Sequence, residues 1–100
     1  MHEQAYKSWL QGKLSSRPIA DSVSRCRRIE ENLKLDLDNE YKRDGGQGLI
    51  ELLEYTTDDK NHNRPPQCNI YFAPGADLKS GLSSLKNAAK KYFDFCRETL

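Results

Sequence analysis

Apolar residues recur along residues 78–96 at the spacing of one helix face, and this pattern constrains the fold more than any other feature. At 100° per residue, these positions fall within an arc of about 100°. They are Leu78, Leu82, Leu85, Ala89, Tyr92, Phe93 and Cys96. The pattern predicts a long amphipathic helix that begins near Asp77 or Ser80 and ends near Arg97, with Asp77 suited to cap its first turn.

Other segments show the same helical periodicity. Residues 18–33 place five apolar residues within an arc of about 120°, and residues 3–14 place four on one face. These residues are Ile19, Val23, Cys26, Ile29 and Leu33, and Tyr6, Trp9, Leu10 and Leu14. Shorter helices are expected after Asp36 or Asp38 and over residues 47–55. The sequence therefore predicts an all-α fold, a compact bundle of four or five helices, in a single domain over residues 1–100.

Residues 56–76 interrupt these helical segments, because they contain many turn-forming residues and no apolar period. They predict one long surface loop. Within it, Ile70, Tyr71 and Phe72 form a short apolar stretch that is compatible with a strand fragment or with one helical turn. A connection of this length in a compact domain is typically functional or mobile.

Charge is distributed unevenly along a chain whose net charge is only +1. Residues 13–34 carry six basic and three acidic residues, residues 35–59 carry two and eight, and residues 79–97 carry five and one. Such asymmetry bears on partners rather than on the fold. No apolar run approaches the roughly 18 residues of a membrane span, and residues 1–14 lack the apolar region of a secretory signal, so a cytoplasmic protein is expected.

Four basic residues line one flank of the apolar face predicted for residues 78–96. Lys79, Lys86, Lys90 and Arg97 fall within an arc of about 40°, and no acidic residue falls inside it. This stripe extends over about 27 Å of helix, which is long enough to follow a phosphate backbone. The alternative is that the side chains keep the helix solvated and cover its apolar edge with their methylene stems.

Arg25, Arg27 and Arg28 form a second basic cluster, on the helix predicted over residues 18–33. Arginine favours bidentate contacts with phosphate or guanine, so Arg25 and Arg28 are further candidates for nucleic-acid contacts. Acidic residues of the same helix are close enough to neutralise much of this charge, which is the alternative interpretation. Whether the two basic clusters share one face stays open at this point.

The sequence contains no signature of catalysis, cofactor binding or metal binding. His62 and Cys68 lack the close ligand pairs of structural zinc sites. Residues 45–48 lack the lysine of a phosphate-binding loop, so we interpret their glycines as a helix stop. Three widely spaced cysteines argue against a disulfide framework, and Cys26 and Cys96 fall on apolar faces. We therefore expect a protein that is not an enzyme and has no cofactor.

Several residue patterns resemble a known helical domain. They are Tyr6, Trp9 and Leu10, then Ser16, Pro18, Ile19 and Ser22, then Leu82, Leu85, Ala89, Tyr92, Phe93 and Phe95. Together they resemble the N-terminal core-binding (SAM-like) domain of tyrosine recombinases and phage integrases, and a similar domain in front of the catalytic domains of some restriction enzymes. The resemblance implies a helical bundle that clamps DNA largely through phosphates. It implies no catalytic residue, and the connection over residues 56–76 is longer than is usual in that family.

Two kinds of function are compatible with the sequence. The first is a non-catalytic domain that contacts the phosphates of double-stranded DNA through Lys79, Lys86, Lys90 and Arg97, with Arg25 and Arg28 next. The second is a protein-interaction module or small regulator that uses Tyr71 and Phe72 or the acidic middle segment. Basic stripes that converge on one open face would favour DNA. Basic residues that are scattered or matched by acids, together with an exposed Tyr71 and Phe72, would favour a protein partner.

Overall fold

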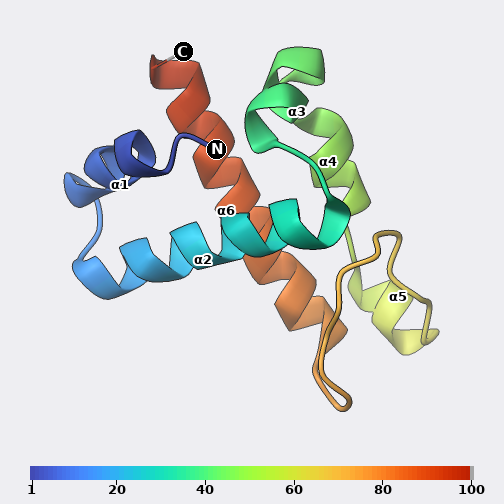
Figure 1. Ribbon diagram of the computed structural model, residues 1–100. Helices are drawn as coiled ribbons and strands as arrows, with labels where there is room; N and C mark the ends of the chain where they lie inside the picture. The colour runs from blue at the N-terminus through green and yellow to red at the C-terminus, as the bar shows by residue number, and fades with distance from the viewer. Residues whose placement is uncertain (100) are drawn as a thin grey trace.

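The computed structural model describes residues 1–99, which fold into a bundle of helices (Figure 1). No strand occurs among these residues, so the predicted all-α fold is confirmed. The helices are α1 (Glu3–Gln11), α2 (Ser16–Leu33), α3 (Leu37–Asp44), α4 (Gln47–Leu52), α5 (Thr57–Asn61) and α6 (Leu78–Thr99). None of these helices combines the length and the apolar composition that crossing a membrane requires.

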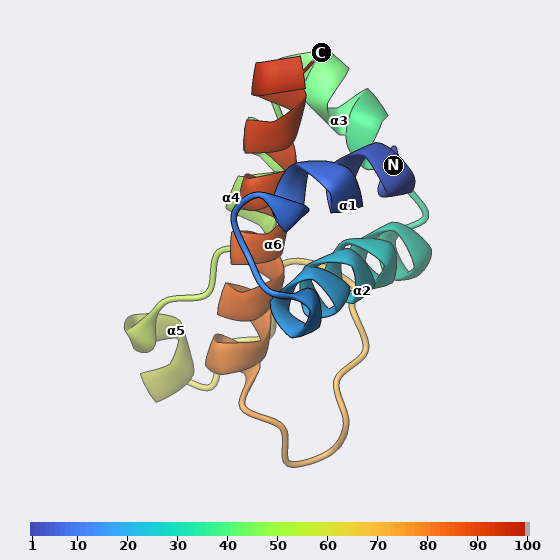
Figure 2. The ribbon, with the colours of Figure 1, turned by 90° about the vertical axis from the view of Figure 1, so that its left-hand side faces the viewer.

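Helix α6 is the central element and packs against each of the other helices. Helix α2 crosses it, α1 packs on both, and α3 and α4 lie along its other side (Figures 1 and 2). Apart from the half-buried Leu78, the predicted apolar face of α6 is buried, and Leu82, Ala89 and Tyr92 have no exposed surface. Because full burial of a leucine or aromatic side chain contributes about 1.5–3 kcal/mol, this face supplies a large part of the stability.

The first helix ends earlier than its apolar pattern predicts. Helix α1 stops at Gln11, where Gly12 begins a turn, so Leu14 lies outside the helix and is half-buried. Trp9 lies at the edge of the core, with its ring centroid 5.8 Å from that of Phe95. The Lys13 ammonium also lies 4.3 Å from the centroid of the Trp9 ring, in a cation–π contact.

Helix α5 lies within the loop predicted over residues 56–76. The Thr56 hydroxyl accepts a hydrogen bond from the Asp59 N–H at 3.1 Å, and the Asp59 carboxylate accepts one from the Thr56 N–H at 2.9 Å. This reciprocal capping box explains why a helix starts at Thr57 without an apolar face. The connection that remains covers residues 62–77, and its residues 70–72 form neither a strand nor a helical turn.

A two-glycine turn joins α3 to α4 beside α6. Gly45 and Gly46 have φ values of 70° and 84°, a conformation that residues with a side chain rarely adopt. Gly46 also lies against the ring of Phe93, since a Cβ at this position would be 2.3 Å from Cε2 of that ring. No atom lies within 4 Å of the corresponding position at Gly45. Glycine is therefore required at position 46 for two separate reasons.

A buried polar network ties the first residues to α3 and α6. The Met1 α-amino group forms ion pairs with Asp38 at 3.3 Å and with two further carboxylates. The Tyr92 hydroxyl donates a hydrogen bond to Asp38 and accepts one from the His2 N–H at 2.8 Å. Burial alone would raise the pKa of Asp38, but the hydrogen bonds from Tyr92 and His2 and the nearby ammonium outweigh it and lower this pKa. Asp38 is therefore held as a buried carboxylate.

Candidate interaction surface

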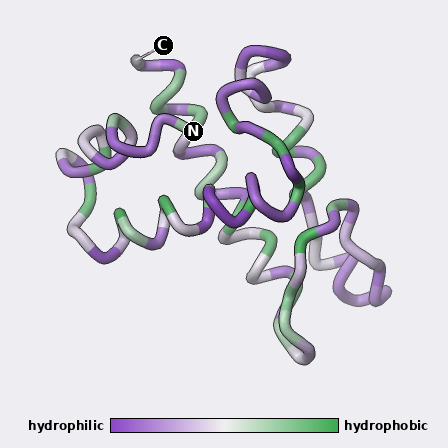
Figure 3. The backbone as a smooth tube through the Cα atoms, viewed as in Figure 1, coloured by the Kyte–Doolittle hydropathy of each residue, from purple (hydrophilic) through white to green (hydrophobic). Residues whose placement is uncertain are grey.

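The connection between α5 and α6 is fixed to α2 on both sides of the Tyr71 side chain. Figure 3 shows an apolar stretch in this connection, and Ile70 within it is buried. The Tyr71 N–H donates to Oδ1 of Asn32 at 3.1 Å, and the Tyr71 C=O accepts from the Arg28 guanidinium. The Asn32 amide also donates to the Arg28 carbonyl at 2.9 Å, which orients its oxygen toward the connection. Helix α2 therefore holds both backbone polar groups of Tyr71.

Phe72 anchors the same connection between α2 and α6. The guanidinium carbon of Arg28 lies 4.7 Å from the centroid of the Phe72 ring, in a cation–π contact. The ring also lies against α6, where a Cβ at Gly81 would be 2.4 Å from its Cε1 atom. A side chain at position 81 would displace the ring. Glycine at this position thus leaves the space in which Phe72 is half-buried.

The Tyr71 side chain, in contrast, is exposed to solvent. Its exposed fraction is 71 %, and among residues 1–99 it is the one large hydrophobic side chain that is exposed. Because its backbone is bonded to α2 and the next residue is anchored, a rigid segment presents the ring. We use the name Tyr71 surface for Arg25, Arg28, Asn32, Tyr71 and Phe72.

The Tyr71 surface contains residues that are predicted from the sequence to serve two different functions. Arg28, a predicted nucleic-acid contact, is bonded to Tyr71 and stacked on Phe72, the predicted partner contacts. Arg25 is exposed one turn before Arg28 on α2. No sequence pattern indicates the part played by Asn32, because its partner is 39 positions away in the chain.

Acidic residues oppose the basic stripe of α6 at two positions. Lys86 forms an ion pair with Glu54, which follows α4, and Arg97 pairs with Asp94 at 2.7 Å. No acidic residue lies within the arc itself, but acidic residues from outside it pair with two of its four cations. A helix projection compares only residues within one arc of one helix, whereas Glu54 comes from another element and Asp94 reaches Arg97 from outside the arc.

Lys90 lies in a groove between α4 and α6. Two adjoining hollows of about 250 and about 480 Å³ share Gln47, Ile50 and Lys90 as lining residues. Lys90 forms no ion pair within residues 1–99. The charge of this groove is nearly balanced, because three acidic and three basic side chains line it. They are Glu51, Glu54 and Asp94, and Lys86, Lys90 and Arg97.

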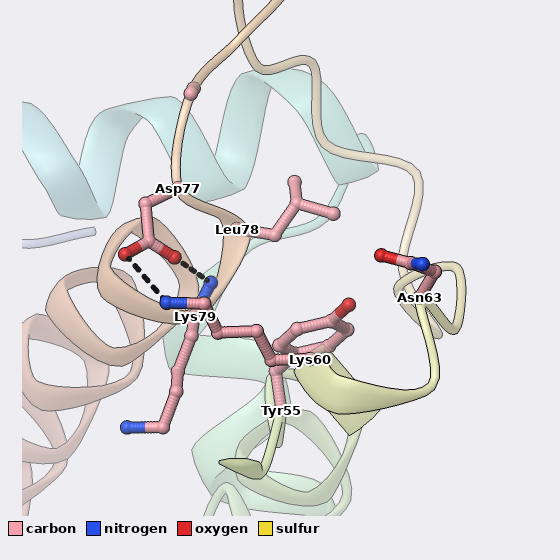
Figure 4. A pocket seen from close by; sticks show the side chains of 7 residues that line it. Tyr55, Lys60, Asn63, Asp77, Leu78 and Lys79 are labelled. Atoms are coloured by element: carbon pink, nitrogen blue, oxygen red, sulfur yellow. Dashed lines mark hydrogen bonds and ion pairs between the residues drawn. The ribbon is translucent and has the colours of Figure 1, made fainter. Parts of the chain in front are cut away.

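Lys79 lines a separate hollow of about 350 Å³ at the start of α6 (Figure 4). Asp77 caps the helix there, since it accepts a hydrogen bond from the Lys79 N–H at 3.1 Å, and it also pairs with Lys60 at 3.5 Å. The ammonium of Lys79 points away from Asp77 in this view. Lys79 is therefore set apart from the other members of the stripe.

Large pKa shifts occur at buried groups of the core. Burial raises the pKa of the Cys26 thiol to about 12 and that of the Cys96 thiol to about 11. Burial, followed by the hydrogen bond to Asp38, also raises the pKa of the Tyr92 phenol. At neutral pH these groups stay protonated, and the thiols act as small apolar side chains.

Comparisons of the chain with protein-family models, with curated proteins and with solved structures find no match. The resemblance to core-binding domains therefore stays a prediction from the residues that carry it. The geometry of the Tyr71 surface and of the α6 stripe is what remains to distinguish the two predicted functions.

Proposed function

We propose that this domain is a protein-interaction module that binds its partner through the Tyr71 surface. The observation that carries the proposal is the exposed Tyr71 ring, on a segment whose backbone N–H and C=O are both bonded to α2. Tyrosine and arginine are the residue types enriched at the energetic centres of protein interfaces. The surface offers both types side by side.

The rigidity of this segment favours binding. Ordering a mobile side chain at an interface costs about 0.5–1.5 kcal/mol, and ordering the loop beneath it adds to that cost. Here the contacts from Arg28 and Asn32 order the backbone of Tyr71 when the domain folds. A partner that covers the ring therefore gains the free energy of burying its apolar area, and less of that gain is lost to the entropy cost of ordering the segment.

Photo-crosslinking followed by titration tests the proposal. One variant carries a photoreactive phenylalanine analogue at position 71, and the matched control carries it at Asn39, which is exposed on α3. We expect crosslinked proteins from position 71 that are missing from position 39. Each such protein is then purified and titrated against the wild-type chain and the Tyr71→Ala variant.

The titration decides the outcome. Truncating a tyrosine at the centre of an interface costs about 2 kcal/mol or more, so the Kd should rise about 30-fold in Tyr71→Ala. Circular dichroism checks that the variant is folded, which we expect because the side chain is exposed. An unchanged Kd in a folded Tyr71→Ala chain would refute the proposal.

DNA binding through phosphates is the second candidate function, and the unpaired cations favour it. Of the six predicted nucleic-acid contacts, Arg25, Lys79 and Lys90 form no ion pair within residues 1–99 and, unlike Arg28, are not bonded to the Tyr71 segment, so each can meet a phosphate without first releasing a partner. Strongly salt-dependent DNA binding arises from about 6–10 phosphate contacts, and three is well below that number. We therefore rank this function below the first.

Salt dependence tests the DNA candidate. Three phosphate contacts should lower the affinity for a labelled duplex about 40-fold between about 50 and about 200 mM salt. Lys90→Glu should weaken binding, whereas Lys42→Glu, an exposed lysine on α3, is the matched control. If no complex forms at the lower salt, or if both variants bind alike, phosphate contacts from α6 are excluded.

A further inference from the structure

Ion pairing of arginines differs between α2 and the rest of the described chain. Each arginine of residues 34–99 pairs with a carboxylate, and within α2 Arg27 pairs with Glu3. Arg17, Arg25 and Arg28 form no ion pair within 4.0 Å among residues 1–99. The guanidinium of Arg28 instead donates to a carbonyl oxygen and stacks on an aromatic ring, both neutral groups. Three guanidinium charges of α2 thus lack a paired carboxylate.

These three arginines lie on one face of α2. At 100° per residue, Arg17, Arg28 and Arg25 fall within an arc of about 80° that also contains Asn32 of the Tyr71 surface. The row extends about 16 Å along the helix. Asp21 lies in the same arc, one turn from Arg17 and one turn from Arg25, so three arginines and one aspartate leave a net charge of +2. The row stays basic despite this acid.

We infer that the partner of this face is an acidic protein segment, with carboxylates on Arg17, Arg25 and Arg28 and an apolar side chain on the Tyr71 ring. The inference rests on the proposed function and specifies the chemistry of the partner. Guanidinium groups bind carboxylates in bidentate geometry, and Arg28 keeps donors beyond the one that its carbonyl contact uses. An extended segment of about five residues spans the row.

The row matches an acidic peptide better than it matches a DNA backbone. A backbone presents evenly spaced phosphates along its whole length, so it would place some of its charge near Asp21. A peptide carries carboxylates only at its acidic residues, so the residue that lies near Asp21 can be uncharged. The exposed ring beside the arginines also offers an apolar contact, which a phosphate backbone does not use.

A displayed library of random peptides tests the inference without knowledge of the natural partner. Peptides of about 12 residues are long enough to cover the row and the ring. They are selected on the immobilised full chain, and peptides that also bind Tyr71→Ala are removed. We expect the remaining peptides to be enriched in aspartate and glutamate, together with aliphatic or aromatic residues.

Titrations then assign the contacts of one selected peptide. Arg25→Ala should raise its Kd about tenfold or more, whereas Lys42→Ala, which removes an exposed cation from α3, should leave it unchanged. A charge exchange controls for folding. Arg25→Glu should bind the selected peptide poorly and should regain affinity for a version in which one acidic residue is replaced by lysine.

Each outcome supports or overturns the inference. Acidic peptides that depend on both Tyr71 and Arg25 support it. Peptides that depend on Tyr71 but are neutral and insensitive to Arg25→Ala overturn it and leave the proposed function standing. If selection yields no peptide that depends on Tyr71, both the inference and the proposed function are overturned. If duplex DNA displaces the acidic peptides and binds more tightly than they do, the inference of an acidic protein segment is overturned, and nucleic acid is the partner instead.

Discussion

The two-glycine turn between α3 and α4 permits a direct test of how tightly this bundle packs against α6. Gly46→Ala adds one methyl group at a position 2.3 Å from Cε2 of Phe93. Phe93 is only 2 % exposed and its ring stacks near that of Tyr41, so it has little room to move. Gly45→Ala adds the same group where no atom lies within 4 Å, and it is therefore the matched control.

The expected losses differ because only one substitution overpacks the core. Both force a residue with a Cβ into a left-handed conformation, which costs about 1–2 kcal/mol. Gly46→Ala adds the overlap with Phe93, and overpacking costs about 1–3 kcal/mol. The free energy of unfolding should therefore fall by about 1–2 kcal/mol in Gly45→Ala and by about 2–5 kcal/mol in Gly46→Ala. Total stabilities of about 5–15 kcal/mol make the second loss large.

Urea unfolding followed by far-ultraviolet circular dichroism measures both losses. With a slope of about 1–3 kcal/mol per molar urea, the two midpoints should differ by a resolvable amount. Phe93→Leu in the Gly46→Ala background should recover part of the difference, since leucine leaves the methyl group more room. Equal midpoints for the two alanine variants would show that the ring does not constrain position 46.

Acid, thiol reagents and removal of one charge test other contacts. The lowered pKa of Asp38 stabilises the fold above the ordinary carboxylate pKa, and this contribution is lost as pH falls through the lower folded value, below about pH 4. Tyr92→Phe should weaken this pH dependence of urea unfolding, and an identical profile would argue against the Tyr92–Asp38 bond. At about pH 8 the thiols of Cys26 and Cys96 should react with a thiol reagent only after the chain unfolds. Burial raises their pKa values to about 12 and about 11, so they stay protonated in the native chain. Rapid labelling of the native chain would contradict their burial. Lys86→Ala should lower the free energy of unfolding by less than about 1 kcal/mol, as is usual for partly exposed ion pairs, and a markedly larger loss would show that this pair is buried in solution.

The long helices could be predicted because burial repeats with the period of the helix. Val23, Cys26 and Ile29 of α2, and Leu82, Leu85 and Ala89 of α6, are all buried on the faces that their spacing predicts. Helix α5 shows the limit of this signal. It has no buried residue, so no apolar period exists to find, and only its Thr-x-x-Asp cap could have revealed it.

The candidate surfaces depend on contacts between elements, which periodicity does not contain. The ion pair between Lys86 and Glu54 joins positions 32 apart, and the bond between Tyr71 and Asn32 joins positions 39 apart. Both depend on how separate elements pack together in the folded chain rather than on any pattern along one helix. Candidate contact residues could therefore be predicted from the sequence, but the contacts that they make with one another in the fold could not.

The central position of α6 has a consequence for how the chain acquires its structure during translation. Helices α1, α3 and α4 have nine, eight and six residues, which is too short for stable helices in isolation. Each of these helices also packs against α6, so their apolar faces are fully covered only when residues 78–99 have emerged, as the packing of Tyr6 in α1 against Tyr92 in α6 illustrates. Synthesis of the last helix should therefore convert a largely unfolded nascent chain into a domain in one cooperative step.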